Sequence, residues 1–202
     1  MSNDTTLKAV DGLTLSDAHR ALLRPGQVVE GTDGIAHRLP RFFFSVPSWP
    51  AAHEIKLAPN FKLSELMTVD SREADLLLHE FPHYVPCAVV ILARYLQDFR
   101  REVDGVVFVS ANGGYRSPAH QLNEPKSVHC WGTAADVYRI GDTYLNDEKS
   151  IAIYAGVAES LGPQVFVKPY VKGDDHLHLD LGFVTVAPRH CSEVQDSRRT
   201  SK

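Results

Sequence analysis

The chain has 202 residues, of which 44% are hydrophobic and 23% are charged. This composition is typical of one globular domain, or one domain with a small appendage, and it excludes collagen-like and wholly disordered chains. The formal net charge is -4, so the chain lacks the basic excess that drives binding to phosphate backbones. We therefore expect no nucleic-acid partner.

The N-terminal sequence does not have the pattern of an export signal. Residues 1–9 (MSNDTTLKA) contain no basic segment followed by an apolar one, and no run approaches the roughly 18 apolar residues of a membrane span. Three cysteines, Cys87, Cys130 and Cys191, are too few for a disulfide framework. We therefore expect a protein made in the cytoplasm with reduced thiols. A substrate outside the cell would require release by lysis or by a dedicated secretion system.

The N-terminal third contains short patterns of both kinds. Ser16 can cap a short helix that Pro25 ends. The apolar run 41–46 (RFFFSV) predicts a buried strand. Further along, Ser71 can cap a helix that Pro82 must stop, because proline lacks the backbone N–H that a helix interior needs.

The clearest helix is predicted over residues 86–103. Its apolar residues recur at spacings of three and four and form one stripe that faces a core: Val89, Leu92, Leu96, Phe99 and Val103. We expect Pro86 in the first turn of this helix, where a missing N–H costs nothing.

The C-terminal half alternates between strands and one helix. The strands are predicted over residues 105–111, 133–138, 164–168 and 176–181, and the helix over residues 148–161. Helices first, followed by strands with one interposed helix, predict the α+β class, with a small antiparallel sheet and helices packed on one side. The tail over residues 188–202 has almost no apolar residue and is expected to lack fixed structure.

Two later segments place polar side chains where a core is expected. Asp136 lies among alanines and a valine, where an unpaired carboxylate would be costly to bury, so we expect a cation beside it. In the strand 176–181 the leucines alternate with the polar residues His176, His178 and Asp180. Two imidazoles and one carboxylate form the ligand set of catalytic zinc, which keeps a fourth position for water. Ordinary polar residues of the core or surface are the alternative.

Three motifs together resemble the D-alanyl-D-alanine metallopeptidase superfamily: GGYRSP at 113–118, SVHCWGTAAD at 127–136 and DDHLHLD at 174–180. This superfamily shares its fold with hedgehog signalling domains and includes zinc carboxypeptidases, D,D-dipeptidases of vancomycin resistance and phage endolysins. The resemblance implies a hedgehog-like fold with a zinc peptidase-like domain over residues 59–187. Residues 1–58 would be an N-terminal extension of unknown role.

The resemblance also implies a role for each matching residue. His129, Asp136 and His178 would bind zinc, Asp175 would be the general base, Arg116 would hold a substrate carboxylate or the developing oxyanion, and Ser127 would line the substrate pocket. Tyr115 is a further candidate for the lining of this pocket, with a place in the core as the alternative. The implied activity is hydrolysis of a peptide bond next to a D-amino acid or a C-terminal carboxylate. Peptidoglycan stem peptides and D-Ala-D-Ala are substrates of this type.

Several alternatives stay open at the level of sequence. His176 shares a strand face with His178 and is an alternative ligand or a second catalytic group, and Asp174 competes with Asp175 as the base. The stretch between Arg116 and His129 is shorter than is usual in the family, which leaves the substrate open. A non-catalytic zinc-containing binding module on the same scaffold is the alternative function, and a metal-free structural protein is a third.

Two neighbouring features are not expected to bind metal. Residues 79–83 (HEFPH) fit the H-E-x-x-H pattern of helical zinc proteases, but Pro82 breaks the helical turn that must bring both imidazoles to one face. Cys130 adjoins His129, and neighbours on an extended segment point to opposite sides. We therefore expect Cys130 to pack under Trp131.

Overall fold

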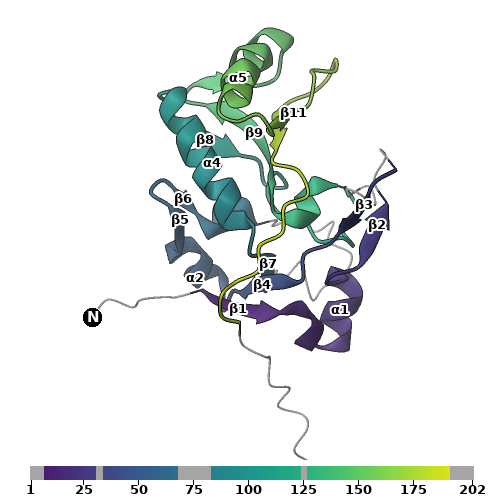
Figure 1. The fold of residues 1–202 in the computed structure, drawn as a ribbon. Helices are drawn as coiled ribbons and strands as arrows, with labels where there is room; N and C mark the ends of the chain where they lie inside the picture. The colour runs from purple at the N-terminus through teal and green to yellow at the C-terminus, as the bar shows by residue number, and fades with distance from the viewer. Residues whose placement is uncertain (1–6, 31–33, 68–82, 124–126, 192–202) are drawn as a thin grey trace, which may run out of the picture.

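The computed structural model describes residues 7–30, 34–67, 83–123 and 127–191 and shows a mixed α/β fold (Figure 1). All strand pairs in this part of the chain are antiparallel, apart from one isolated parallel bridge between Met67 and Tyr115. The expected α+β class is therefore confirmed, whereas the hedgehog-like scaffold stays a prediction. The helix expected between Ser71 and Pro82 lies outside the described residues.

The N-terminal elements form two small sheets around a short helix. Their bounds are β1 (Lys8–Asp11), η1 (Gly12–Thr14), α1 (Asp17–Leu23), β2 (Val28–Glu30), β3 (Ala36–Arg38) and β4 (Phe42–Ser45). Ser16 caps α1 as expected, because its side chain accepts from the backbone N–H of His19. β2 and β3 pair with each other, while β1 and β4 join β7 (Tyr84–Pro86) in a three-stranded sheet.

The expectation for Pro86 is wrong. Pro86 is the last residue of β7, opposite Phe43 of β4, and the long helix α4 runs over Val89–Glu102 with Ala88 as its N-cap. The apolar stripe begins at Val89, where the helix begins. Pairing with β4 is a tertiary contact that the helical spacing of the following residues does not reveal.

The main core lies between α4, the hairpin of residues 56–62 and the sheet of the C-terminal half. The remaining elements before α4 are α2 (Trp49–Glu54), β5 (Lys56–Ala58), β6 (Phe61–Lys62) and η2 (Leu63–Leu66). Buried side chains from both sides of residue 58 meet in this core, such as Leu57 and Leu92. The described part of residues 1–58 therefore packs on the rest of the chain.

The C-terminal half forms a five-stranded sheet in which β9 pairs with β8, β10 and β12, and β11 pairs with β12. The bounds are β8 (Val107–Val109), η3 (Val128–Trp131), β9 (Ala134–Ile140), β10 (Thr143–Tyr144), α5 (Glu148–Ser160), β11 (Phe166–Val167) and β12 (Leu177–Asp180). The expected strands and helix are confirmed, although most are shorter than predicted. α5 contacts α4 through a hydrogen bond from the Tyr95 hydroxyl to the carbonyl of Ala158, 2.7 Å long. Within the described ranges, no helix is both long and apolar enough to cross a membrane.

A close backbone approach connects η2 to the loop that follows β8. The N–H of Tyr115 donates to the carbonyl of Leu66 over 2.9 Å, and a Cβ on Gly114 would overlap the Leu66 backbone. A Cβ on Gly113 would likewise lie 2.6 Å from the carbonyl oxygen of Asp136. Both glycines are therefore required by space, and they bring the loop against β9.

Replacing Gly114 by alanine is expected to destabilise the protein by roughly 1–3 kcal/mol, the usual cost of overpacking a filled interior. Gly156→Ala is the matched control, because Gly156 lies in the middle of α5 with nothing near its added Cβ. Alanine there should stabilise by about 1 kcal/mol through helix propensity. Urea denaturation of both variants measures the two changes, and a Gly114→Ala protein as stable as the unmutated chain would contradict the close approach.

Candidate metal centre

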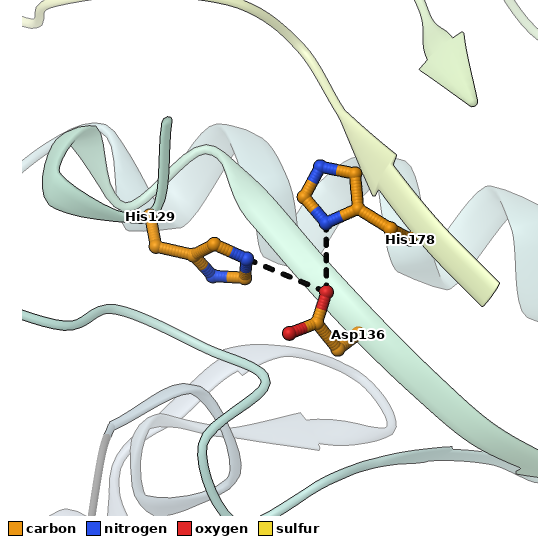
Figure 2. Close-up of side chains that lie close together, drawn as sticks. All are labelled: His129, Asp136 and His178. Atoms are coloured by element: carbon orange, nitrogen blue, oxygen red, sulfur yellow. Dashed lines mark hydrogen bonds and ion pairs between the residues drawn. The ribbon is translucent and has the colours of Figure 1, made fainter. Parts of the chain in front are cut away.

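Three side chains from separate elements meet at one point: His129 from η3, Asp136 from β9 and His178 from β12 (Figure 2). One potential ligand atom from each lies within 4.8 Å of the others. Oδ1 of Asp136 is 2.7 Å from Nδ1 of His178 and 3.4 Å from Nε2 of His129. The structure therefore brings together the three residues that the motifs suggested as ligands, in an arrangement that can hold a metal ion.

Strand register explains two of these positions. His178 and Asp136 are direct partners across the β12–β9 pair, so their side chains leave the same face of the sheet. A slip of one residue would turn His178 to the opposite face. On the other side, Gly132 in the left-handed conformation (φ 68°) ends η3 and turns the chain from His129 into β9.

Each imidazole is held through its second nitrogen. Nδ1 of His129 lies 2.8 Å from the carbonyl oxygen of Gly114, and Nε2 of His178 lies 3.3 Å from Oδ2 of Asp180. A carbonyl and an ionised carboxylate only accept hydrogen bonds, so each imidazole donates there. In the neutral form of each ring, the other nitrogen then has its lone pair on the side of Asp136. Metal-ligating histidines offer the metal a lone pair in the same way, while their second nitrogen donates to an acceptor.

Asp180 contacts the candidate site, although the sequence assigned it no role. Its side chain is buried, and Oδ1 accepts from the backbone N–H of Gly182 over 2.7 Å while Oδ2 faces His178. The alternation of leucines with polar residues in this strand already placed Asp180 on the same face as His178, which was the signal in the sequence that could have identified it. The carbonyl of Gly114 gave no such signal, because a backbone acceptor has no side chain to identify it.

The pKa values of the cluster follow from burial and from these contacts. Burial lowers the pKa of His129, whose ring is therefore neutral near pH 7. Burial also disfavours the charged form of His178, but hydrogen bonds and charge from Asp136 and Asp180 prevail and raise its pKa to about 9. Burial opposes ionisation of Asp136, yet the protonated His178 beside it holds the pKa of this carboxyl well below its usual range. Without an ion, a proton on His178 compensates the Asp136 charge.

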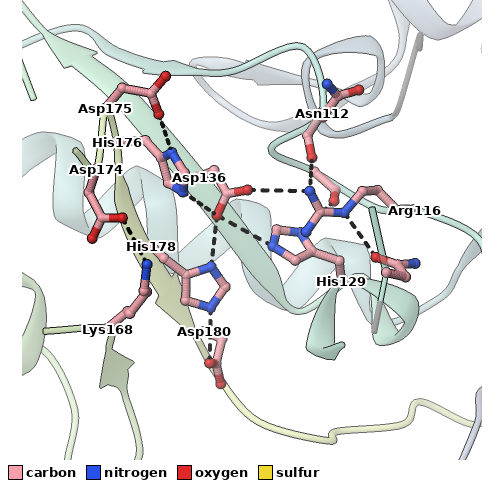
Figure 3. A network of polar contacts seen from close by, with 12 residues as sticks. Asn112, Arg116, His129, Asp136, Lys168, Asp174, Asp175, His176, His178 and Asp180 are labelled. Carbon is pink, nitrogen blue, oxygen red and sulfur yellow. Dashed lines mark hydrogen bonds and ion pairs between the residues drawn. The ribbon is translucent and has the colours of Figure 1, made fainter. Parts of the chain in front are cut away.

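Arg116 occupies the other side of the carboxylate. Its Nη1 is 3.6 Å from Oδ2 of Asp136, the oxygen that does not face the histidines (Figure 3). Nη1 also donates to the carbonyl of Asn112, and Nε donates to Oδ1 of Asn123, both over 3.0 Å. The cation expected beside Asp136 is thus confirmed, and two asparagines that the sequence did not single out fix its orientation.

Asp175 is connected to the cluster through His176 and not directly. Its side chain is 84% exposed, and Oδ1 lies 2.7 Å from Nδ1 of His176. Nε2 of His176 lies 3.6 Å from Oδ1 of Asp136. His176 therefore stands between the predicted base and the three potential ligands, as Figure 3 shows.

Asp174 has a different set of partners. Its carboxylate accepts from Nζ of Lys168 over 2.9 Å and from the backbone N–H of Val171 over 2.8 Å. These bonds close the loop between β11 and β12. The two neighbouring carboxylates thus have different partners. Asp175 contacts an imidazole that faces the cluster, whereas Asp174 stabilises the loop.

The two predicted substrate-binding residues lie in different surroundings. Ser127 is half-buried immediately before η3, while Tyr115 is only 2% exposed and belongs to the main core. Their role in substrate binding stays a prediction. The HEFPH motif lies outside the described residues except for His83.

Cys130 packs as expected, although the local structure around it differs from the expected extended segment. The segment after Ser127 is a turn of 3-10 helix and not an extended segment. Cys130 nevertheless forms a buried cluster with Trp131 and Leu39, and its Sγ lies 3.2 Å from Nδ2 of Asn123. Packing with Trp131 is therefore confirmed, for a reason other than strand alternation.

Comparisons with known proteins add no identity: no protein-family model, no curated protein and no solved structure matches this chain. The chemistry of the site must therefore be inferred from its own groups. These are two imidazoles and one carboxylate that converge, with a guanidinium beside them.

Proposed function

We propose that this protein is a zinc-dependent peptidase that hydrolyses a peptide bond next to a D-amino acid or a C-terminal carboxylate, as in peptidoglycan stem peptides or D-Ala-D-Ala. One observation carries the proposal. Nε2 of His129, Oδ1 of Asp136 and Nδ1 of His178 converge, while the second nitrogen of each imidazole is held by an acceptor.

The donor set fits a catalytic metal. Two neutral imidazoles and one carboxylate oxygen leave a position for water on a four-coordinate ion, as in catalytic zinc sites. Bound zinc lowers the pKa of its water to about 7 and polarises a scissile carbonyl. The second oxygen of Asp136 faces Arg116, which supports binding of the ion through Oδ1 alone.

Arg116 supplies a permanent positive charge beside the proposed ion. A guanidinium stays protonated at any working pH, so it can bind a substrate carboxylate or stabilise a developing oxyanion. The bonds to Asn112 and Asn123 hold it in place before substrate arrives. Such preorganisation is what makes electrostatic stabilisation effective.

Asp175 and His176 supply the proton acceptor. Asp175 bonds Nδ1 of His176, which leaves Nε2 directed toward the cluster. In this arrangement the proton of the attacking water passes to Nε2 of His176, and Asp175 holds the ring and stabilises its charge. The exposure of Asp175 supports action through His176, because its carboxylate does not itself face the three ligands.

Zinc binding is expected to release about one proton per ion at pH 7.5, since His178 is protonated below its pKa of about 9 and must lose that proton to become a ligand. The apparent association constant should therefore rise by roughly tenfold per pH unit up to about pH 9 and then level off. Calorimetric titration in buffers of different ionisation enthalpy measures the released protons. Release of none at pH 7.5 would argue against His178 as a ligand.

His129→Ala should abolish stoichiometric zinc binding, because it removes one of three ligands. His53→Ala is the matched control, since this histidine is exposed on α2. Atomic absorption on both purified variants gives the zinc content. Equal zinc in the two proteins would exclude His129 from the site.

Zinc-loaded protein is expected to cleave muropeptides or D,D- or L,D-dipeptides, with products identified by mass spectrometry. Asp175→Asn should retain zinc and lose roughly 10²–10⁴-fold in rate, because His176 then loses the group that orients it and stabilises its charge as proton acceptor, and general acid–base catalysis usually contributes this much. Asp174→Asn is the matched comparison in the same loop and should change the rate far less. Undiminished hydrolysis by a zinc-loaded Asp175→Asn protein would reject the role of Asp175, and bound zinc without any hydrolysis would favour the non-catalytic binding module.

A further inference from the structure

The hairpin of β2 and β3 contacts the turn that carries His129. Nε1 of Trp131 donates to the carbonyl of Arg38, at the end of β3, over 2.8 Å. Trp131 is completely buried and lies two residues after His129. Leu39, directly after β3, and Val29 of β2 complete the cluster around Trp131.

The same hairpin contacts the chain just after His178. Phe183 stacks on His37 of β3, with ring centroids 3.7 Å apart and planes 18° apart. Phe183 also meets Trp131 edge-on, with ring centroids 4.8 Å apart. We call His37, Phe183 and Trp131 the aromatic clamp.

Two hydrogen bonds beside the aromatic clamp connect the two histidine-bearing segments to each other. The hydroxyl of Thr133 donates to the carbonyl of Gly182 over 2.6 Å, and the N–H of Leu181 donates to the carbonyl of Thr133 over 3.0 Å. Thr133 lies between His129 and Asp136, and Leu181 follows β12. The segments of His129 and His178 are therefore joined to each other next to the aromatic clamp, which contacts the hairpin.

The segments need such support. η3 is a four-residue turn of 3-10 helix, and short turns of this kind have poor hydrogen-bond geometry and little stability of their own. β12 has only four residues, and the chain beyond it forms no further strand in the described part. The angle between the two imidazoles must therefore depend on tertiary contacts.

We infer that the β2–β3 hairpin is a positioning element of the metal centre, and that Trp131 and Phe183 act as positioning residues that set His129 against His178. The inference rests on the proposed metal site and not on the peptidase activity. It gives β2, β3 and Leu39 a task that no motif in the sequence assigns.

Cobalt(II) provides the test, because its visible absorption reports the geometry of the ligands around it. Phe183→Ala removes the centre of the aromatic clamp, and Trp131→Phe keeps a ring but removes the N–H that bonds Arg38. Both variants should bind zinc more weakly, by up to the roughly 10–100-fold that losing a direct outer partner of a metal ligand usually costs. Their cobalt spectra should differ from that of the unmutated protein.

Leu23→Ala is the matched control for a merely structural effect. Leu23 is buried in a separate cluster beside α1 and β4, so its loss should lower the stability of the metal-free protein without changing zinc affinity or the cobalt spectrum. His37→Ala is a milder variant, because this half-buried ring is at the outer end of the aromatic clamp. It should weaken zinc binding in the same direction even if Phe183→Ala fails to fold.

Clamp variants that lose stability but keep the zinc affinity and cobalt spectrum of the unmutated chain would overturn the inference. An unmutated protein that binds neither ion would overturn the metal centre itself, and the inference with it. A zinc-binding protein that lacks peptidase activity but loses affinity in Phe183→Ala and His37→Ala would support the inference while rejecting the proposed reaction. Failure of the positioning role and failure of the proposed function are thus distinguishable.

Discussion

The structure around the site depends on the burial of one carboxylate. Asp136 stands in the fully buried part of β9, where an isolated negative charge would be strongly destabilising. Arg116 compensates one oxygen, and the imidazoles of His129, His176 and His178 face the other. These partners come from distant parts of the chain, so neutralising a single charge holds the loop after β8, η3 and β12 together. The same need for a cation makes the point of convergence suitable for a metal ion.

The sequence predicted those features that depend on local pattern. The apolar stripe that begins at Val89 identified α4, and the alternation of His178 and Asp180 with leucines identified both β12 and its polar face. An acidic residue among alanines was enough to predict a cation beside Asp136. In each case neighbouring residues alone determine the burial, and no distant contact is needed to interpret them.

Features that depend on distant contacts could not be predicted in this way. Pro86 fits the first turn of a helix equally well, and only its pairing with Phe43 places it in a strand. The short strands β2 and β3 have no pattern that separates them from loops. The contact of Asp175 with His176 depends on the rotamers of two adjacent side chains, which the spacing of a motif does not predict. The carbonyl of Gly114 meets His129 only in the folded loop, so the sequence could not identify it as a partner of that imidazole.

The order of the ligands along the chain has a consequence for biosynthesis. Residues 129 and 136 leave the ribosome well before β12 is made, and His178 reaches Asp136 only when β12 pairs with β9. The last of the three potential ligands is thus contributed by a strand near the end of the described chain. A growing polypeptide would hold an ion loosely, through two groups at most, until synthesis has passed that strand. Tight binding of an ion at the proposed centre would therefore have to wait until β12 has paired with β9.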